Sequence, residues 1–290
     1  MIKLATTCLC ALCPLPALAS AGVVHIVAAE NFYGDIASQL AGPEARVASV
    51  LSNPDADPHL YEADIAAARA IAGADLVIYN GLHYDTWMTR LLAGIGSSHR
   101  LVVDAAAVAH RDAAGGNPHL WYDPAAMRAV ARAISRDLQQ IDPAHRALYA
   151  QRLQRFLDSV RPLDAEIGRL RTLYAGTPVA ATEPVAAYLV AALGLEMREQ
   201  RFQLSVMNDT EPGARETGAF EEDLKSRRVR VLIYNKQVTS TSIERLLGIA
   251  RASRVPIVGV TETEPAGVDY QQWMLGELRA LEQALADSRP

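Results

Sequence analysis

The sequence predicts an α/β protein of two lobes, each with a small parallel sheet flanked by helices, joined by one long rigid helix. Short β-branched and apolar runs alternate with longer helical patterns, which is typical of parallel sheets covered on both faces. The run LVIYN at 76–80 is echoed by VLIYN at 231–235, although buried parallel strands often look alike. Between the two halves lies a single, unusually long helical stripe.

The expected strands fall into two groups. VVHIVAA, RVASVL, ADLVIYN and RLVVDAA belong to an N-terminal lobe at 21–142, and PVAAT, VRVLIYN and VPIVGV to a C-terminal lobe at 176–290. Helical patterns at 61–72, 124–140, 184–193, 239–253 and 269–287 lie between or after these strands. This alternation predicts strand–helix–strand units.

The linker helix is predicted at 143–175. Its apolar residues are spaced alternately by three and four positions, as one face of a helix requires: Leu153, Phe156, Val160, Leu163, Ile167 and Leu170. Pro143 suits the first helical position, and Gly176 suits a left-handed C-terminal cap. Pro162 lies inside the pattern, so we expect a kink there. At 1.5 Å per residue the helix would be about 45 Å long.

Residues 1–20 have the pattern of a secretory signal peptide. Lys3 precedes an apolar run, and Ala17-Leu18-Ala19 has the small-x-small pattern of a cleavage site, so the mature chain is expected to begin near Ser20 or Ala21. The alternative is a retained N-terminal anchor. All three cysteines lie in this segment, so the mature chain is expected to hold any metal through His, Asp, Glu or backbone oxygen. We expect a periplasmic protein without membrane insertion after leader removal.

Composition limits the partners. The full chain has a formal net charge of −5 and lacks basic runs, which argues against a nucleic-acid partner.

Two histidines lie in nearly the same local sequence. His59 lies in DADPHLYEAD at 55–64, and His119 in GGNPHLWYDP at 115–124. A preceding proline holds the chain extended and fixes the direction of the imidazole. Each histidine follows an expected strand, and ligands of parallel α/β sheets bind beyond the carboxyl ends of strands. Either histidine alone could simply be hydrogen-bonded in a turn, but the duplicated setting predicts half of a metal site.

The second half supplies acidic candidates. Glu183 follows the expected strand PVAAT, and Glu262 and Glu264 follow the last strand. Each could instead be a carboxylate favoured at a helix N-terminus. Glu264 competes with Glu262 for the fourth position. His83, which follows ADLVIYN, is a candidate accessory group at the mouth of the cleft.

At these residues the chain resembles the metal-binding solute-binding proteins of ABC transporters, the zinc and manganese receptors that include surface antigens once described as adhesins. The resemblance covers the mature chain and includes VAAENFYGDIASQLAG, DPHLYE, ADLVIYNG, NPHLWYDP, TEPVAAYLVAALGL and VTETEP…DYQQWM. It implies two α/β lobes joined by a long helix. Residue by residue, it implies the metal ligands His59, His119, Glu183 and Glu262.

Two departures bear on the metal. Many zinc receptors of this family have a histidine at the third ligand, where this chain has Glu183, and a His-rich loop before the second ligand that is absent here. The resemblance implies one Mn²⁺ or Zn²⁺ ion as cargo, with Fe²⁺ possible, and no resident cofactor. It also implies a membrane permease partner with a separate ATPase subunit, and a monomeric receptor.

Two other function classes remain as alternatives. A metal-dependent hydrolase needs an open coordination position and a general base, and a surface or adhesion protein would use the metal structurally. The chain has no P-loop and no G-x-S-x-G nucleophile motif. A binding protein rather than an enzyme is therefore the favoured interpretation.

Overall fold

The predicted fold class is confirmed. The computed structural model describes residues 22–53, 58, 61–111, 116–238 and 240–288, and its two sheets each contain four parallel strands. The strand orders are β2-β1-β3-β4 and β6-β5-β7-β8, which are the same topology used twice. The strands are β1 Val24–Glu30, β2 Ala45–Leu51, β3 Leu76–Tyr79, β4 Leu101–Asp104, β5 Pro178–Ala181, β6 Glu196–Arg198, β7 Val231–Asn235 and β8 Ile257–Val260.

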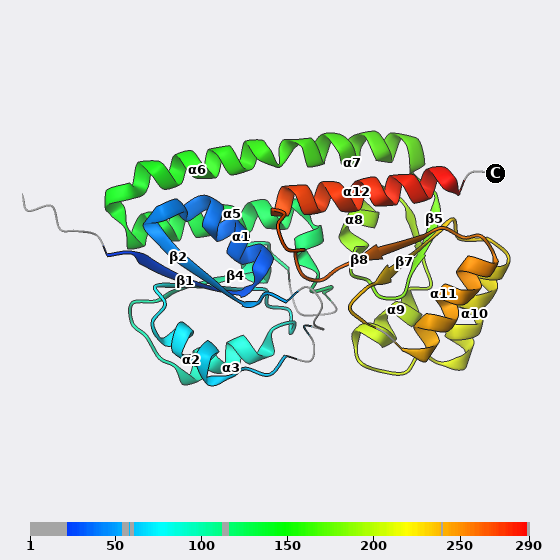
Figure 1. Cartoon of the computed structure of the whole chain (residues 1–290), viewed down its shortest axis with the longest axis horizontal. Helices are drawn as coiled ribbons and strands as arrows, with labels where there is room; N and C mark the ends of the chain where they lie inside the picture. Colours follow the sequence, from blue (N-terminus) through cyan, green and yellow to red (C-terminus); the bar gives the residue numbers. More distant parts are fainter. Residues whose placement is uncertain (1–21, 54–57, 59–60, 112–115, 239, 289–290) are drawn as a thin grey trace, which may run out of the picture.

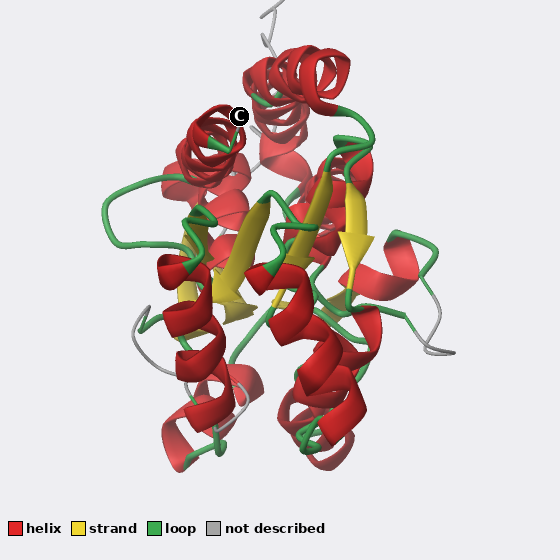
Figure 2. Ribbon diagram, turned by 90° about the vertical axis from the view of Figure 1, so that its right-hand side faces the viewer, coloured by secondary structure: helices red, strands yellow, loops and turns green. Residues whose placement is uncertain are grey.

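Helices surround both sheets (Figure 1), and the view from the C-terminal lobe shows them in front of its sheet and above it (Figure 2). The N-terminal lobe contains α1 Asn31–Ala41, α2 Ile65–Ala72, α3 Thr86–Gly94, α4 Ala105–Val108 and α5 Pro124–Ile141; the connection contains α6 Arg146–Ser159 and α7 Arg161–Tyr174; the C-terminal lobe contains α8 Ala187–Ala192, α9 Gln200–Met207, α10 Ala214–Lys225, α11 Thr241–Ala252 and α12 Tyr270–Asp287. Short 3₁₀ helices lie at Gly42–Glu44, Leu120–Tyr122 and Pro143–His145. None of the helices in the described ranges is long and apolar enough to cross a membrane.

The seven strands expected from sequence all form. The eighth, β6, was missed because it is three residues long with a charged residue at each end, and so lacks an apolar run. The echo LVIYN/VLIYN falls on β3 and β7, which occupy equivalent third positions in the two sheets. The echo therefore reflects equivalent positions in the two lobes.

The long connection runs across the top of both lobes as one rod (Figure 1). Its two segments, α6 and α7, are separated only by Val160, whose backbone stays right-handed at φ −89° and ψ −5°. Pro162 lies near the start of α7, and because proline has no N–H it cannot bond the carbonyl four residues earlier. Gly176 has φ +78°, as expected of a left-handed cap.

One apolar core runs through both lobes. It joins the upper faces of the two sheets to α1, α5, α6, α7 and α12, whereas the opposite face of each sheet has a smaller core of its own. Strand alternation explains the division: Ile26 and Ala28 of β1 face the shared core, and Val27 and Ala29 face the local one. The lobes are therefore packed together and not merely tethered.

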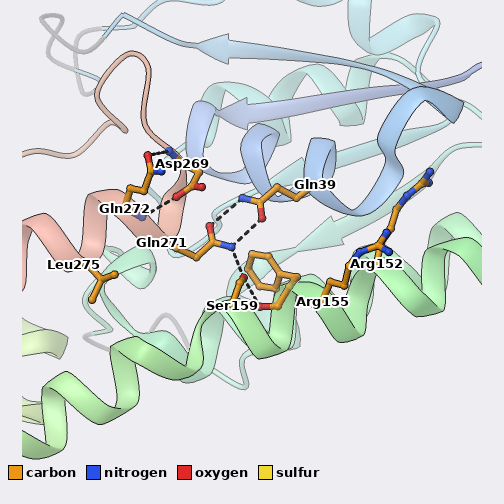
Figure 3. A pocket seen from close by; sticks show the side chains of 9 residues that line it. Gln39, Arg152, Arg155, Ser159, Asp269, Gln271, Gln272 and Leu275 are labelled. Carbon is orange, nitrogen blue, oxygen red and sulfur yellow. Dashed lines mark hydrogen bonds between the residues drawn. The ribbon is translucent and has the colours of Figure 1, made fainter.

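Hydrogen bonds strengthen this contact between the lobes. They involve residues 261–272, which follow β8 and enter α12. Gln271 of this segment exchanges hydrogen bonds with Gln39 of α1, at 2.8 and 3.0 Å, and donates to Ser159 Oγ at 2.6 Å. Figure 3 shows these three side chains meeting at the edge of an open pocket of about 390 Å³. Tyr270 adds a bond from its hydroxyl to the Trp121 carbonyl at 2.9 Å.

Candidate metal site

His119 lies in the loop between the N-terminal sheet and α5, and it is fully buried. Asn117 fixes its orientation: the Asn117 Oδ1 atom accepts from the backbone N–H of His119 at 3.0 Å and lies 2.5 Å from its ring Nδ1. The ring Nδ1 therefore carries the proton, and Nε2 keeps its lone pair. Among the described residues, none forms a hydrogen bond with that buried Nε2 atom, which is the arrangement of a histidine prepared to bind a metal.

Glu183 lies two residues after the end of β5 and is 3% exposed. Its Oε1 atom lies 4.0 Å from His119 Nε2. Its Oε2 atom accepts a hydrogen bond from Asn235 Nδ2 at 2.8 Å. The Glu183 carboxylate therefore turns Oε1 toward His119 and Oε2 toward Asn235.

Glu262 follows β8 and is also fully buried. Its Oε2 atom lies 3.7 Å from His119 Nε2 and accepts from the Tyr84 hydroxyl at 3.0 Å. Its Oε1 atom accepts from the same Asn235 Nδ2 at 2.5 Å. Its backbone N–H donates to Gln237 Oε1, which fixes the main chain of the loop.

These three side chains form the one group of potential metal-binding residues in the described part of the chain. One ligand atom from each of His119, Glu183 and Glu262 lies within 4.8 Å of the others. A neutral imidazole nitrogen and two carboxylate oxygens are a suitable donor set for a divalent transition metal. The histidine comes from one lobe and the carboxylates from the other, so an ion here would lie between the lobes.

The other candidates are placed differently. His59 lies outside the described residues, so its role stays a prediction. Glu264 is not in the group: its backbone N–H and carbonyl pair with the side chain of Asn31 in α1. Burial, with added repulsion from nearby Asp35, raises the pKa of Glu264 to about 9. Glu264 thus belongs to the contact between the lobes, and the structure favours Glu262 over it.

His83 is exposed and lines a separate pocket of about 240 Å³. It belongs to a turn in which Gly81, Leu82 and His83 all have left-handed backbone, at φ 80°, 52° and 65°. A Cβ on Gly81 would lie 2.6 Å from Asp104 Oδ1, so the turn requires glycine there. Two consecutive non-glycine residues in this region store backbone strain, as is common near functional sites.

Tyr84 directly follows this strained turn, and its hydroxyl bonds Glu262 in the site. Asp85, whose pKa is raised to about 6 by burial, accepts hydrogen bonds from the backbone N–H groups of Asn80 and Gly81 and so fixes the turn. Burial, with the charge of Glu262, raises the pKa of the Tyr84 hydroxyl well above its usual range. Tyr84 therefore remains a hydrogen-bond donor to Glu262.

Sequence reasoning missed Asn117, Tyr84 and Asn235. A signal for the last was present, since the LVIYN/VLIYN echo ends in asparagine in both lobes. Asn80 donates to the Pro118 carbonyl at 2.9 Å and so supports the His119 loop, whereas Asn235 holds the two carboxylates. The repeated asparagine therefore supports the histidine in the N-terminal lobe and the two carboxylates in the C-terminal lobe.

The chain matches the family model described as "Zinc-uptake complex component A periplasmic" over residues 26–284. It belongs to this family. Among curated relatives it is 27% identical to the zinc-binding protein TroA of Treponema pallidum over 70% of this chain and 67% of that protein. It is 30% identical to the iron-binding protein YfeA of Yersinia pestis, over 46% of this chain and 44% of that one.

Solved structures of the family share the fold. The periplasmic zinc-binding protein TroA from Treponema pallidum superposes with a TM-score of 0.75 at 21% identity, covering 90% of this chain and 98% of that one. A ZnuA crystal structure gives 0.72 at 18% identity, covering 92% and 100%. Members of the family thus keep the two-lobe frame while their sequences diverge widely.

Proposed function

We propose that this protein is the extracytoplasmic solute-binding component of an ABC transporter, which captures one divalent transition-metal ion between its lobes and delivers it to a membrane permease. The observation that carries the proposal is the buried group of His119, Glu183 and Glu262. In it, His119 Nε2, which has no hydrogen-bond partner among the residues that the structure describes, lies 4.0 and 3.7 Å from two carboxylates of the opposite lobe. Burying a polar atom such as this nitrogen without a partner costs free energy, which a bound metal ion would offset.

Family membership supports the transport role. Relatives are named for zinc, iron and manganese, and the manganese ABC transporter lipoprotein scaA of Streptococcus gordonii is named as a substrate-binding component. By the same reasoning, the partner of this chain is a permease with a separate ATPase subunit. We propose His59 as a ligand in addition to His119, Glu183 and Glu262. We further propose the periplasm as the location after leader removal, and a monomer with no enzymatic activity.

A titration tests capture. We expect apoprotein to bind one equivalent of Zn²⁺ or Mn²⁺, and His119→Ala to lose tight binding while still unfolding cooperatively. His99→Ala is the matched control, because His99 is exposed and outside the group. Equal stoichiometry and affinity in His119→Ala and the wild type would remove the basis of the proposal.

A second assay separates transport from the alternatives. A carrier releases its ion when it docks to its permease, so loaded protein should lose metal to permease-containing vesicles. A structural metal would stay bound and its removal would unfold the protein. Turnover of a broad ester and phosphate panel would instead indicate a hydrolase.

The metal itself follows from the donor set. Two carboxylates are harder ligands than the histidines of a His₃ site, which favours Mn²⁺ or Fe²⁺ more than such a site does. The general affinity order still places Zn²⁺ above Mn²⁺. We therefore expect Zn²⁺ to bind at least as tightly in vitro, whichever of these ions the cell delivers.

A further inference from the structure

The position of Asn235 follows from the strand order. In the sheet β6-β5-β7-β8, the strand β7 lies between β5 and β8, and all three are parallel. Glu183 follows β5, Glu262 follows β8, and Asn235 is the last residue of β7. The side chain that ends the central strand therefore lies between the two carboxylates, and it is 1% exposed.

The amide of Asn235 has a defined orientation. Its Oδ1 atom accepts from the backbone N–H of Gln237 at 3.0 Å, so Nδ2 faces the carboxylates. That nitrogen has two N–H groups, one for Glu183 Oε2 and one for Glu262 Oε1. Two ionised carboxylates that lie close together repel each other. The Asn235 amide, which donates to both, holds Glu183 and Glu262 side by side.

The two carboxylate oxygens of each glutamate therefore have different neighbours. The oxygens bound to Asn235 are Glu183 Oε2 and Glu262 Oε1, whereas the oxygens nearest His119 Nε2 are Glu183 Oε1 and Glu262 Oε2. The Tyr84 hydroxyl also donates to Glu262 Oε2, so hydrogen bonds to both oxygens fix the orientation of this carboxylate. Binding a metal through both oxygens of either glutamate would require that carboxylate to turn, so that both oxygens face the ion, and the turn would distort its buried hydrogen bond to Asn235.

We propose that Asn235 determines metal selectivity by restricting each glutamate to one coordinating oxygen, with Tyr84 reinforcing this at Glu262. The sequence alone leaves one-oxygen and two-oxygen ligation equally open. Single-oxygen ligation keeps the coordination number low, which suits Zn²⁺, whereas two-oxygen ligation raises it toward the six-coordinate geometry that Mn²⁺ prefers. This inference rests on the proposed metal-binding function of the same site.

Asn235→Ala tests it, with Tyr84→Phe as a milder variant that keeps the aromatic ring. Asn80→Ala is the matched control, because it truncates the equivalent asparagine of the other lobe and touches the His119 loop instead of the carboxylates. Two measurements apply to each protein: the ratio of Mn²⁺ to Zn²⁺ dissociation constants, and the coordination number. Visible absorption of bound Co²⁺, intense for four-coordinate and weak for six-coordinate ions, and X-ray absorption of bound Mn²⁺ report the latter.

We expect Asn235→Ala to lower the Mn²⁺/Zn²⁺ ratio of dissociation constants about tenfold, the lower end of effects known for partners that orient metal ligands, and to weaken the Co²⁺ absorption. Tyr84→Phe should move both readouts in the same direction by less. Asn80→Ala should weaken both metals without changing their ratio.

The outcomes separate the inference from the proposed function. A wild-type protein that binds no metal refutes the proposed function itself. Wild-type metal binding with an unchanged ratio and unchanged coordination in folded Asn235→Ala refutes only the selectivity role, as does a six-coordinate Co²⁺ spectrum in the wild type. If circular dichroism shows that Asn235→Ala does not fold, the same criteria apply to Tyr84→Phe.

Discussion

Replacing Asn117 by alanine should weaken metal binding although Asn117 touches no metal. Its Oδ1 atom is the acceptor for both the backbone N–H and the ring Nδ1 of His119. Without it, the buried ring keeps a donor with no acceptor and can rotate or change tautomer. Loss of such an orienting partner costs about 10–100-fold in metal affinity, which is roughly 1.4–2.8 kcal/mol.

The assay is a competition titration of the apoprotein with Zn²⁺ and a chromogenic chelator at fixed pH. Asn117→Asp is the control, because it keeps an oxygen acceptor for His119, although it loses the donation from Asn117 Nδ2 to the Pro184 carbonyl at 2.7 Å and adds a carboxylate. We expect the aspartate variant to bind Zn²⁺ nearly as tightly as the wild type. An alanine variant with wild-type affinity, or an aspartate variant as weak as alanine, would refute the orienting role.

Three further outcomes follow. Changing Glu183 to histidine should shift the Zn²⁺/Mn²⁺ preference further toward Zn²⁺ by creating a softer donor set; an unchanged affinity ratio in parallel titrations would contradict the argument. Burial raises the pKa of Glu277 in α12 to about 7, against the favourable hydrogen bond from Trp273 and the charge of Lys236. The folded state therefore holds this proton where the unfolded state has lost it, and stability should fall between about pH 4.5 and 7 by up to about 1.4 kcal/mol per unit. Glu277→Gln should flatten this part of the pH profile of thermal unfolding and raise stability at pH 8, and a profile identical to the wild type would count against it. Because the lobes share one apolar core and the Gln39–Gln271–Ser159 bonds, X-ray scattering curves of apo and metal-loaded protein should nearly coincide; a large closure would contradict this.

The order of strands and helices was readable from the sequence because each signal is local. Apolar runs mark buried parallel strands, and the stripe from Leu153 to Leu170 marks the connecting helix. Histidines and acids in the segments that follow strands were also readable as candidates, because the carboxyl ends of parallel strands share one edge of a sheet. The short, charged β6 carried no such signal.

The tertiary structure decided what depends on contacts between distant segments. Glu262 and Glu264 have the same local sequence setting, and their tertiary contacts separate them: Asn31 docks onto the Glu264 backbone, whereas Tyr84 and Asn235 bind the Glu262 carboxylate. Asn235 ends a buried strand like many others, and only the position of β7 between β5 and β8 places its amide against both carboxylates. The sequence determines which side chains follow the end of a strand. Strand order and the packing of the lobes determine which of those side chains come into contact.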